Sequence, residues 1–356
     1  MSRPIFAVGL VVALGAAAEI IPGAEYFRIF SPPAPASGES PSEPAPDAAP
    51  DLSEGETELK QSSVSRQAMA TPEEGASVQR ARGPIGGHEA LEKIEDEAPP
   101  VPLLDPTGKS LDNFFQALAS TQRKEKGAIT RIAHFGDSIV VSDYVSGTLR
   151  RNFQKQFGDA GHGYMLVANA WPAYFHNDVF RFATAGFRVS RIVGPTTKDG
   201  FYGLGGVTFR AYSGVRATYG TAEKGKFGRN VSHFTLSYLA RPHGGQFEVL
   251  IDGKKQERID TRADQKQVVR KKFSMIDGEH KLELVVKKGE SRFFGIVLER
   301  DEPGVVYDAL GVQGARIRFL DKQEDEHFAE ELKWRNPNLL VFQFGANESG
   351  DGYAYS

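Results

Sequence analysis

The middle of the chain, from about residue 180 to residue 300, is a series of short segments in which apolar and polar residues alternate. The clearest of these segments are HFTLSYLA, GQFEVLIDG, KQVVRKKFSM, HKLELVVKKG and RFFGIVLER. A period of two predicts β-strands that bury one face, as Phe247, Val249 and Ile251 would do in the second segment. Several such strands at this spacing predict an all-β sandwich of the jelly-roll kind, which we expect over residues 181–302.

This region contains two Asp-Gly pairs, Asp252-Gly253 and Asp277-Gly278. Asp and Gly tolerate the left-handed backbone that tight hairpin turns require. We therefore expect a tight turn between consecutive strands at each pair.

The chain on either side of the sandwich has a strand-and-helix pattern instead. AITRIAHF predicts a strand, and apolar residues at every fourth position from Val145 to Phe157 predict an amphipathic helix after it. EDEHFAEELKWRN has acids early and bases late, as a helix favours, and NLLVFQFG predicts a strand buried on both faces of a parallel sheet. Residues 101–180 and 303–356 therefore predict one α/β domain interrupted by the sandwich.

The N-terminus has the pattern of an export signal. Arg3 comes shortly before the apolar stretch IFAVGLVVALGAAA, and Ala16–Ala18 supply the small residues of a cleavage site. The stretch has the length of a signal-peptide core and is short for a membrane span. We expect residues 1–24 to be a signal peptide or an uncleaved N-terminal anchor.

The segment that follows, residues 25–100, is rich in Pro, Ser, Ala and Glu. From residue 31 to residue 100 it has 14 acidic and 5 basic side chains, a net charge of 5 − 14 = −9. Such a composition buries too little apolar surface to offset chain entropy. We expect a disordered linker that tethers the folded part to the N-terminal segment.

Composition excludes several kinds of chemistry. The 356 residues include no cysteine, which rules out disulfides, thiolate catalysis and Cys-ligated zinc. The formal net charge of −3 carries no nucleic-acid signature, and no metal-binding motif is present, so we expect no metal and no other cofactor. Residues 220–300 contain 17 basic and 11 acidic residues, which fit either a solvated sandwich face or a site for an anionic glycan.

Three short motifs each follow a predicted strand. They are FGDS with Ser138, LGVQGA with Gly314 and FGANES with Asn347. Loops at the carboxyl ends of parallel strands converge on one crevice, so these three residues should meet in space. A serine hydroxyl can attack an ester carbonyl, and the N–H groups of Ser138 and Gly314 with the Asn347 amide could bind the resulting oxyanion.

The same three motifs resemble those of the SGNH, or GDSL-type, serine esterases, with Ser138, Gly314 and Asn347 at the positions of the family's Ser, Gly and Asn. The run HFGDSIVVSDYVSGTLRRNFQKQFGDAGHGY is similar to an exported bacterial branch that removes acetyl groups from peptidoglycan or other polysaccharides. Some members of that branch carry a carbohydrate-module-like sandwich at this place. The resemblance implies a three-layer, flavodoxin-like α/β hydrolase domain, incomplete here, with an inserted jelly-roll-like sandwich.

One family motif is missing. The catalytic Asp-x-x-His block should follow the Asn motif at a distance, and neither its His nor its Asp is present in this chain. His134 precedes Ser138 by four residues on a strand, about 13 Å away and too far to take its proton. His162, His176 and His327 are expected to be surface or packing residues. The 356-residue chain therefore resembles a C-terminally truncated enzyme, for which we expect negligible esterase activity.

The sequence thus favours an exported serine esterase that removes O-acyl groups, with O-acetyl as the expected group, from peptidoglycan or another envelope polysaccharide. Two alternatives stay open: a lipid or thioester acylhydrolase of the same family, and a non-catalytic glycan-binding envelope protein. The expected partner is an acylated polysaccharide, with no nucleic acid, and with membrane attachment through the N-terminus only. The expected location is the periplasm, cell envelope or extracellular space.

Overall fold

The computed structural model describes residues 104–351. The expected signal segment at 1–24 and the acidic linker at 25–100 lie outside the described residues. In the described range, no helix combines the length and the apolar character needed to cross a membrane.

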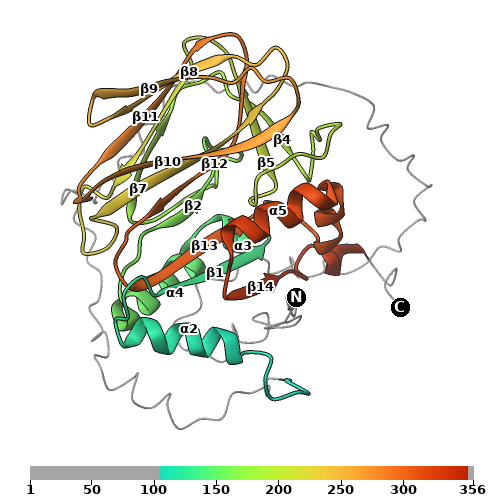
Figure 1. Cartoon of the computed structure of the whole chain (residues 1–356). Coiled ribbons are helices and arrows are strands. Elements are labelled where there is room, and N and C mark those ends of the chain that lie inside the picture. Colours follow the sequence, from blue (N-terminus) through green and yellow to red (C-terminus); the bar gives the residue numbers. More distant parts are fainter. Residues whose placement is uncertain (1–103, 352–356) are drawn as a thin grey trace, which may run out of the picture.

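Three parallel strands form the sheet that carries the predicted site residues (Figure 1): β1 (Ile129–Gly136), β13 (Gly304–Gly311) and β14 (Leu339–Gln343). Their spatial order is β13-β1-β14, so the first strand in the chain lies in the middle. Gly136 is level with both Gly311 and Gln343, and all three strands therefore end together. In such sheets ligands bind beyond the carboxyl ends, where the strand order reverses, which here is between β1 and β14.

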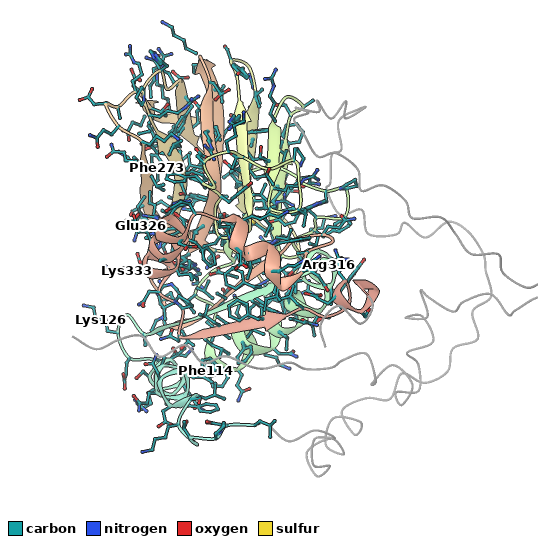
Figure 2. All side chains as sticks on the ribbon, turned by 90° about the vertical axis from the view of Figure 1, so that its right-hand side faces the viewer. Phe114, Lys126, Phe273, Arg316, Glu326 and Lys333 are labelled. Atoms are coloured by element: carbon teal, nitrogen blue, oxygen red, sulfur yellow. The ribbon has the colours of Figure 1, made fainter. Side chains whose placement is uncertain are left out.

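Helices cover both faces of this sheet. On one face α2 (Asp112–Gln122) and α4 (Tyr144–Phe157) pack against Ile132 and Tyr307 through an apolar cluster. On the other face lies α5 (Asp325–Arg335), which packs against the same core as β1. Figure 2 shows this arrangement, with Phe114 of α2 on the opposite side of the sheet from Glu326 and Lys333 of α5.

The helix expected after the FGDS motif is present as α4, but its buried face is more polar than the sequence predicts. Leu149 is 36% exposed, whereas Arg150 and Gln154 are buried. Arg150 donates to the two carboxylate oxygens of buried Asp143 at 3.1 and 2.7 Å. The apolar repeat therefore predicts the helix correctly and its inward face only in part, because a buried ion pair occupies the interior.

Two antiparallel sheets form the middle of the chain. The six-stranded sheet runs, in spatial order, through β10 (Gln267–Gly278), β7 (Val231–Ala240), β12 (Ser291–Glu299), β5 (Val207–Ala211) and β4 (Arg188–Arg191), with β2 (Gly163–Met165) also paired to β12. The five-stranded sheet runs through β3 (Val179–Ala183), β6 (Arg216–Thr221), β11 (Lys281–Lys288), β8 (Gln246–Ile251) and β9 (Lys254–Asp260). Phe247, Val249 and Ile251 are buried as predicted, so the β-rich component expected from the alternation is present.

One of the two predicted Asp-Gly turns is correct and the other is wrong. Asp252 and Gly253 connect β8 to its neighbour β9, with φ of 51° and 74°. Asp277 and Gly278 instead end β10, which pairs with β7, while the next strand, β11, belongs to the other sheet. The chain therefore crosses between sheets after Gly278, and the local Asp-Gly signal could not reveal this crossing because it carries no information on pairing.

Buried charges join the α/β part to the sandwich. Arg335 of α5 donates to Asp308 of β13 at 2.5 and 2.9 Å and to Glu299 of β12 at 2.6 Å. Glu299 also accepts from Arg131 of β1 at 3.0 and 3.2 Å. These buried ion pairs connect α5 and β1 to the last strand of the sandwich, and removing one partner would leave a buried charge uncompensated.

The last strand differs from its prediction. NLLVFQFG was expected to be buried on both faces, and β14 does contact apolar cores on both sides of the sheet. Its five residues are nevertheless only half-buried, and in the described range β14 is an edge strand. The assignment of the α/β part to the complete flavodoxin-like layout stays a prediction.

Candidate functional site

Ser138 lies at a sharp turn from β1 into the short helix α3 (Ser138–Val141). The side chain of Asp137 caps this helix by accepting the Ile139 N–H at 3.0 Å. Asp137 is buried, whereas Ser138 is exposed. Among the described residues no hydrogen-bond partner engages the Ser138 hydroxyl, which is therefore open to an incoming group.

Two glycines allow α3 to lie directly against the ends of the strands. A Cβ on Gly311 would stand 2.3 Å from the Val141 nitrogen, and one on Gly136 would stand 2.5 Å from a methyl group of Val140. Both distances are far below van der Waals contact, so a side chain at either position would force its neighbours to shift. Gly311 is the last residue of β13, where it creates room for the serine turn.

Gly314 lies in the turn that follows β13. The Ala315 N–H donates to the Val312 carbonyl at 3.0 Å and closes this turn. Gly314 has a φ of +74°, is exposed, and has no atom within 4 Å of where a Cβ would be. Its backbone is therefore accessible to a ligand. A 3-10 helix, η3 (Ile317–Lys322), follows.

Asn347 lies beyond β14, just before the 3-10 helix η4 (Glu348–Asp351). Its side-chain nitrogen donates to the Ala315 carbonyl at 2.9 Å. The second and third motifs, which are separated by more than 30 residues in sequence, are therefore in direct contact. A primary amide has two N–H groups, so one remains for another acceptor.

Glu348 connects the same segments and was not singled out from the sequence. Its carboxylate accepts the Ile317 N–H at 2.7 Å and the Gly345 N–H at 2.9 Å. Burial raises the pKa of Asp137, and the charge of Glu348 raises it further, so the two carboxyl groups are close enough to interact. The segments that carry Ser138, Gly314 and Asn347 thus converge at one end of the sheet, where the sequence predicted that they would meet.

The histidines considered as bases are engaged elsewhere. His134 is buried beside β13, where its Nδ1 lies 2.9 Å from the Tyr307 hydroxyl, and burial lowers its pKa to about 4. His162 and His176 pair with each other, Nε2 to Nδ1, at 2.7 Å. In residues 104–351 no hydrogen bond joins a histidine to Ser138, and these contacts agree with the packing roles expected from the sequence.

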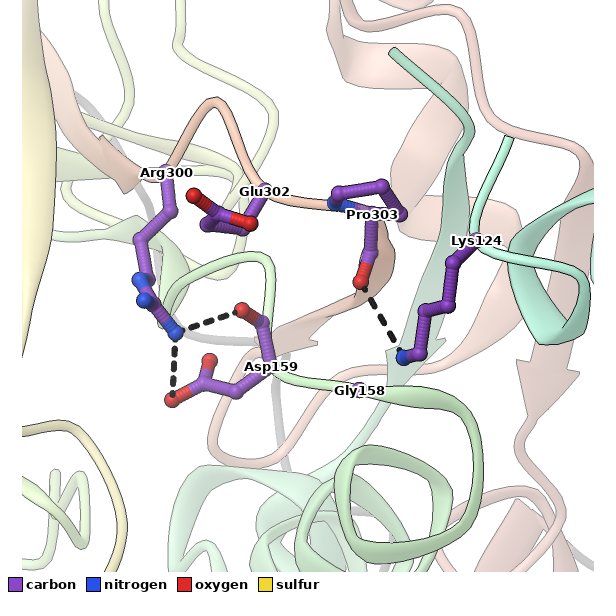
Figure 3. A pocket seen from close by; sticks show the side chains of 6 residues that line it. All are labelled: Lys124, Gly158, Asp159, Arg300, Glu302 and Pro303. Atoms are coloured by element: carbon purple, nitrogen blue, oxygen red, sulfur yellow. Dashed lines mark hydrogen bonds and ion pairs between the residues drawn. The ribbon is translucent and has the colours of Figure 1, made fainter. Parts of the chain in front are cut away.

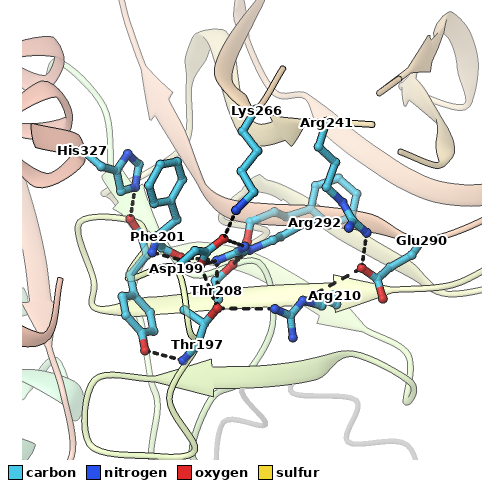
Figure 4. A network of polar contacts seen from close by, with 12 residues as sticks. Thr197, Asp199, Phe201, Thr208, Arg210, Arg241, Lys266, Glu290, Arg292 and His327 are labelled. Carbon is cyan, nitrogen blue, oxygen red and sulfur yellow. Dashed lines mark hydrogen bonds and ion pairs between the residues drawn. The ribbon is translucent and has the colours of Figure 1, made fainter. Parts of the chain in front are cut away.

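His327 belongs to the contact between α5 and the sandwich. Its ring stacks on Phe201 with centroids 4.5 Å apart, and its Nε2 lies 2.6 Å from the Tyr202 carbonyl. Figure 4 shows this ring at the border of a polar network in which Arg292 binds Asp199 at 2.7 and 3.0 Å. His327 is therefore a structural residue of this junction.

The basic residues of the sandwich are largely paired with acids. Lys255 and Arg258 both bind Glu248, at 2.6 and 2.9 Å. Lys266 binds Asp199 at 3.2 Å, in the network of Figure 4. This pairing favours a solvated, ion-paired surface over a dedicated site for an anionic glycan. In the part of the chain that the structure describes, no group of three His, Asp or Glu residues could hold a metal ion.

A hollow of about 410 Å³ lies away from these loops, at the amino ends of the strands. Figure 3 shows it, with Arg300 donating to the Asp159 carbonyl at 2.9 Å and Lys124 reaching the Pro303 carbonyl at 3.5 Å. Gly304, next to Pro303, begins β13. Because ligands of parallel sheets bind at the opposite end, we assign this hollow no role in the candidate site.

Comparison with known proteins identifies a shared fold. No protein-family model matches the chain, and no curated protein matches it in sequence. A solved structure of a peptidoglycan O-acetylesterase matches 68% of this chain with a TM-score of 0.53 and 20% identity. The chain spans 63% of the length of that structure. At this identity the match shows that the two proteins share a fold.

Two further solved structures resemble parts of the chain. A family two carbohydrate esterase from Clostridium thermocellum matches 27% of this chain and 29% of its own, with 18% identity and a TM-score of 0.19. The carbohydrate-binding module CsCBM6-3 from Clostridium stercorarium, in complex with cellobiose, matches 40% of this chain and 98% of its own, with 12% identity and a TM-score of 0.24. Of these three matches, only the peptidoglycan O-acetylesterase structure has a TM-score above 0.5, so the shared fold rests on that match.

Proposed function

We propose that the protein is an exported serine esterase of the SGNH type that removes O-acyl groups, above all O-acetyl, from peptidoglycan or another envelope polysaccharide. One observation carries this proposal. An exposed serine, an accessible glycine turn and an asparagine amide converge beyond the carboxyl ends of β1, β13 and β14, and the last two are joined at 2.9 Å. This arrangement has the parts that acyl transfer needs, a nucleophile and preorganised oxyanion donors.

The chemistry would begin with attack of the Ser138 oxygen on the acyl carbonyl carbon. The carbonyl oxygen would take up negative charge and accept hydrogen bonds from the N–H groups of Ser138 and Gly314 and from the free N–H of Asn347. Collapse of this intermediate would break the bond to the sugar oxygen, which would take the proton first removed from Ser138 and leave as a hydroxyl, and an acyl-serine would remain. Water would then release the carboxylic acid and restore Ser138.

The serine proton needs a base, which we assign to the histidine of an Asp-x-x-His block, as the family resemblance implies. His134, His162, His176 and His327 contact other groups. Residues 1–24 would direct export, either as a cleaved signal or as an anchor, and residues 25–100 would tether the catalytic part.

The shared fold with a peptidoglycan O-acetylesterase supports a polysaccharide substrate over a lipid ester. A second candidate function, a non-catalytic glycan-binding protein, is favoured by the packing contacts of His134, His162, His176 and His327. The two candidates differ in whether Ser138 forms a covalent bond with substrate.

The test is acetate release from O-acetylated peptidoglycan by the protein expressed from its complete gene. We expect release that Ser138→Ala abolishes, and little hydrolysis of a lysophospholipid. Release that persists in Ser138→Ala would reject the proposal, and binding of the glycan without any release would support the second candidate. The 356-residue chain alone should turn over p-nitrophenyl acetate negligibly, and turnover that depends on Ser138 would show this expectation to be wrong.

A further inference from the structure

Glu348 makes two hydrogen bonds that span the candidate oxyanion site. One carboxylate oxygen accepts the Ile317 N–H at 2.7 Å, three residues after Gly314. The other accepts the Gly345 N–H at 2.9 Å, two residues before Asn347. The side chain therefore connects the turn that carries Gly314 to the turn that carries Asn347.

A third hydrogen bond joins the same two turns. The Asn347 side chain donates to the Ala315 carbonyl at 2.9 Å, so the two turns are joined at Ala315 and again at Ile317. Neither turn belongs to a strand or an α-helix, and Gly314 and Gly345 both have positive φ. Turns of this kind have few constraints of their own, and their relative position depends on such cross-links.

We propose that Glu348 is a positioning residue that holds Gly314 and Asn347 at the spacing needed to bind an oxyanion. This inference rests on the proposed function, because it assigns Glu348 a part in the same reaction. Carboxylate bonds to backbone N–H groups are stronger than bonds between neutral groups, which suits a rigid clamp. Both oxygens of Glu348 accept backbone N–H groups, so the side chain is placed to hold the two loops together.

Glu348→Gln tests the clamp with little change of shape. The glutamine oxygen can accept one of the two N–H groups, but its NH2 group is a donor and cannot accept the other. At least one bond is therefore lost. Glu324→Gln is a matched control, because the Glu324 side chain also accepts a backbone N–H, that of His327 at 2.7 Å, at the start of α5.

In the protein expressed from its complete gene, Glu348→Gln should lower kcat for acetate release about 10- to 100-fold with KM changed less than about two-fold, because misplaced donors weaken only the transition state. Glu324→Gln should change neither by more than about two-fold. If Ser138→Ala is inactive but Glu348→Gln has a normal kcat, the positioning role is wrong and the proposed function still stands. Full activity in Ser138→Ala would instead reject the proposed function.

A second measurement decides the clamp without turnover. In the 356-residue chain, Glu348→Gln should speed amide hydrogen exchange at Ile317 or Gly345 about ten-fold or more and shift the NMR signals of the Asn347 side-chain amide. Glu324→Gln should leave these signals unchanged. Unchanged exchange and unchanged Asn347 signals in Glu348→Gln would overturn the proposal, whatever the activity.

Discussion

Gly311 sets how closely the serine turn can approach the sheet. A Cβ there would lie 2.3 Å from the backbone nitrogen of Val141, so either α3 or the end of β13 must move. We expect Gly311→Ala to lower the free energy of unfolding by about 1–3 kcal/mol, as overpacking does. Chemical denaturation would measure this change.

Gly278→Ala is the control for this prediction. Gly278 also ends a strand, but its nearest neighbours would stand 3.7 and 3.9 Å from a Cβ, which is ordinary contact. The free energy of unfolding of the Gly278→Ala variant should therefore stay close to that of the wild type. Equal stability of the Gly311→Ala and Gly278→Ala variants would show that close packing of α3 does not matter.

Gly314 and Gly253 form a second matched pair at the residue scale. Both have a φ of 74° and open space around the missing Cβ. Each change to alanine should therefore cost about 1 kcal/mol, the usual strain of a left-handed residue. Only Gly314→Ala should also slow acetate release, because only Gly314 lies in the proposed oxyanion site. Comparable rates for both variants would remove Gly314 from the site.

At the scale of the elements, the contact between α5 and the sheets depends on Arg335. This buried side chain binds two buried carboxylates, Asp308 and Glu299, which belong to β13 and β12. Arg335→Met should destabilise the protein by about 3–5 kcal/mol, because it leaves Asp308 buried without its arginine and leaves Glu299 with Arg131 alone. Urea denaturation would report the loss.

Arg123→Met is the matched control for Arg335→Met. Arg123 pairs with Glu125 at 2.7 Å, but both side chains are about half exposed. Exposed ion pairs contribute little to stability, so Arg123→Met should change the urea midpoint of unfolding very little. If both substitutions had equally small effects, the buried network would not hold the two parts together.

At the scale of the whole molecule, buried histidines should make the fold sensitive to acid. Burial lowers the pKa of His134 to about 4 and that of His176 to about 3, and it also lowers the pKa of His162 and His327. Between these values and the ordinary value of about 6.5, the unfolded chain binds more protons than the folded one. Stability should therefore be fully present above pH 6.5 and fall as the pH drops from 6.5 towards 4.

Urea titrations at pH 7.5, 6 and 5 would measure this dependence. His134→Gln should make it shallower, because it removes one group that protonates on unfolding. The pKa of His280 is shifted in the opposite direction from that of the buried histidines. Burial lowers this pKa, but hydrogen bonding to Asp252 helps to raise it above its ordinary value. A free energy of unfolding that does not change between pH 7.5 and 5 would contradict the prediction.

Local sequence patterns were sufficient to predict several elements of this protein and the order of its motifs. Periodicity is a local property, so it correctly predicted the alternating strand with Phe247, the helix that begins at Tyr144 and the strand before Ser138. The three motifs could be placed together because parallel strands always bring their carboxyl ends to one edge.

Which groups meet depends on contacts between segments that are distant in sequence. The bonds of Glu348 to Ile317 and Gly345 join residues whose positions depend on the pairing of β13 and β14 with β1. The crossing of the chain after Gly278 and the polar interior of α4 likewise depend on partners distant in sequence. Local patterns report what each segment tends to form, whereas buried ion pairs, sheet pairing and loop clamps arise only when distant segments pack against one another.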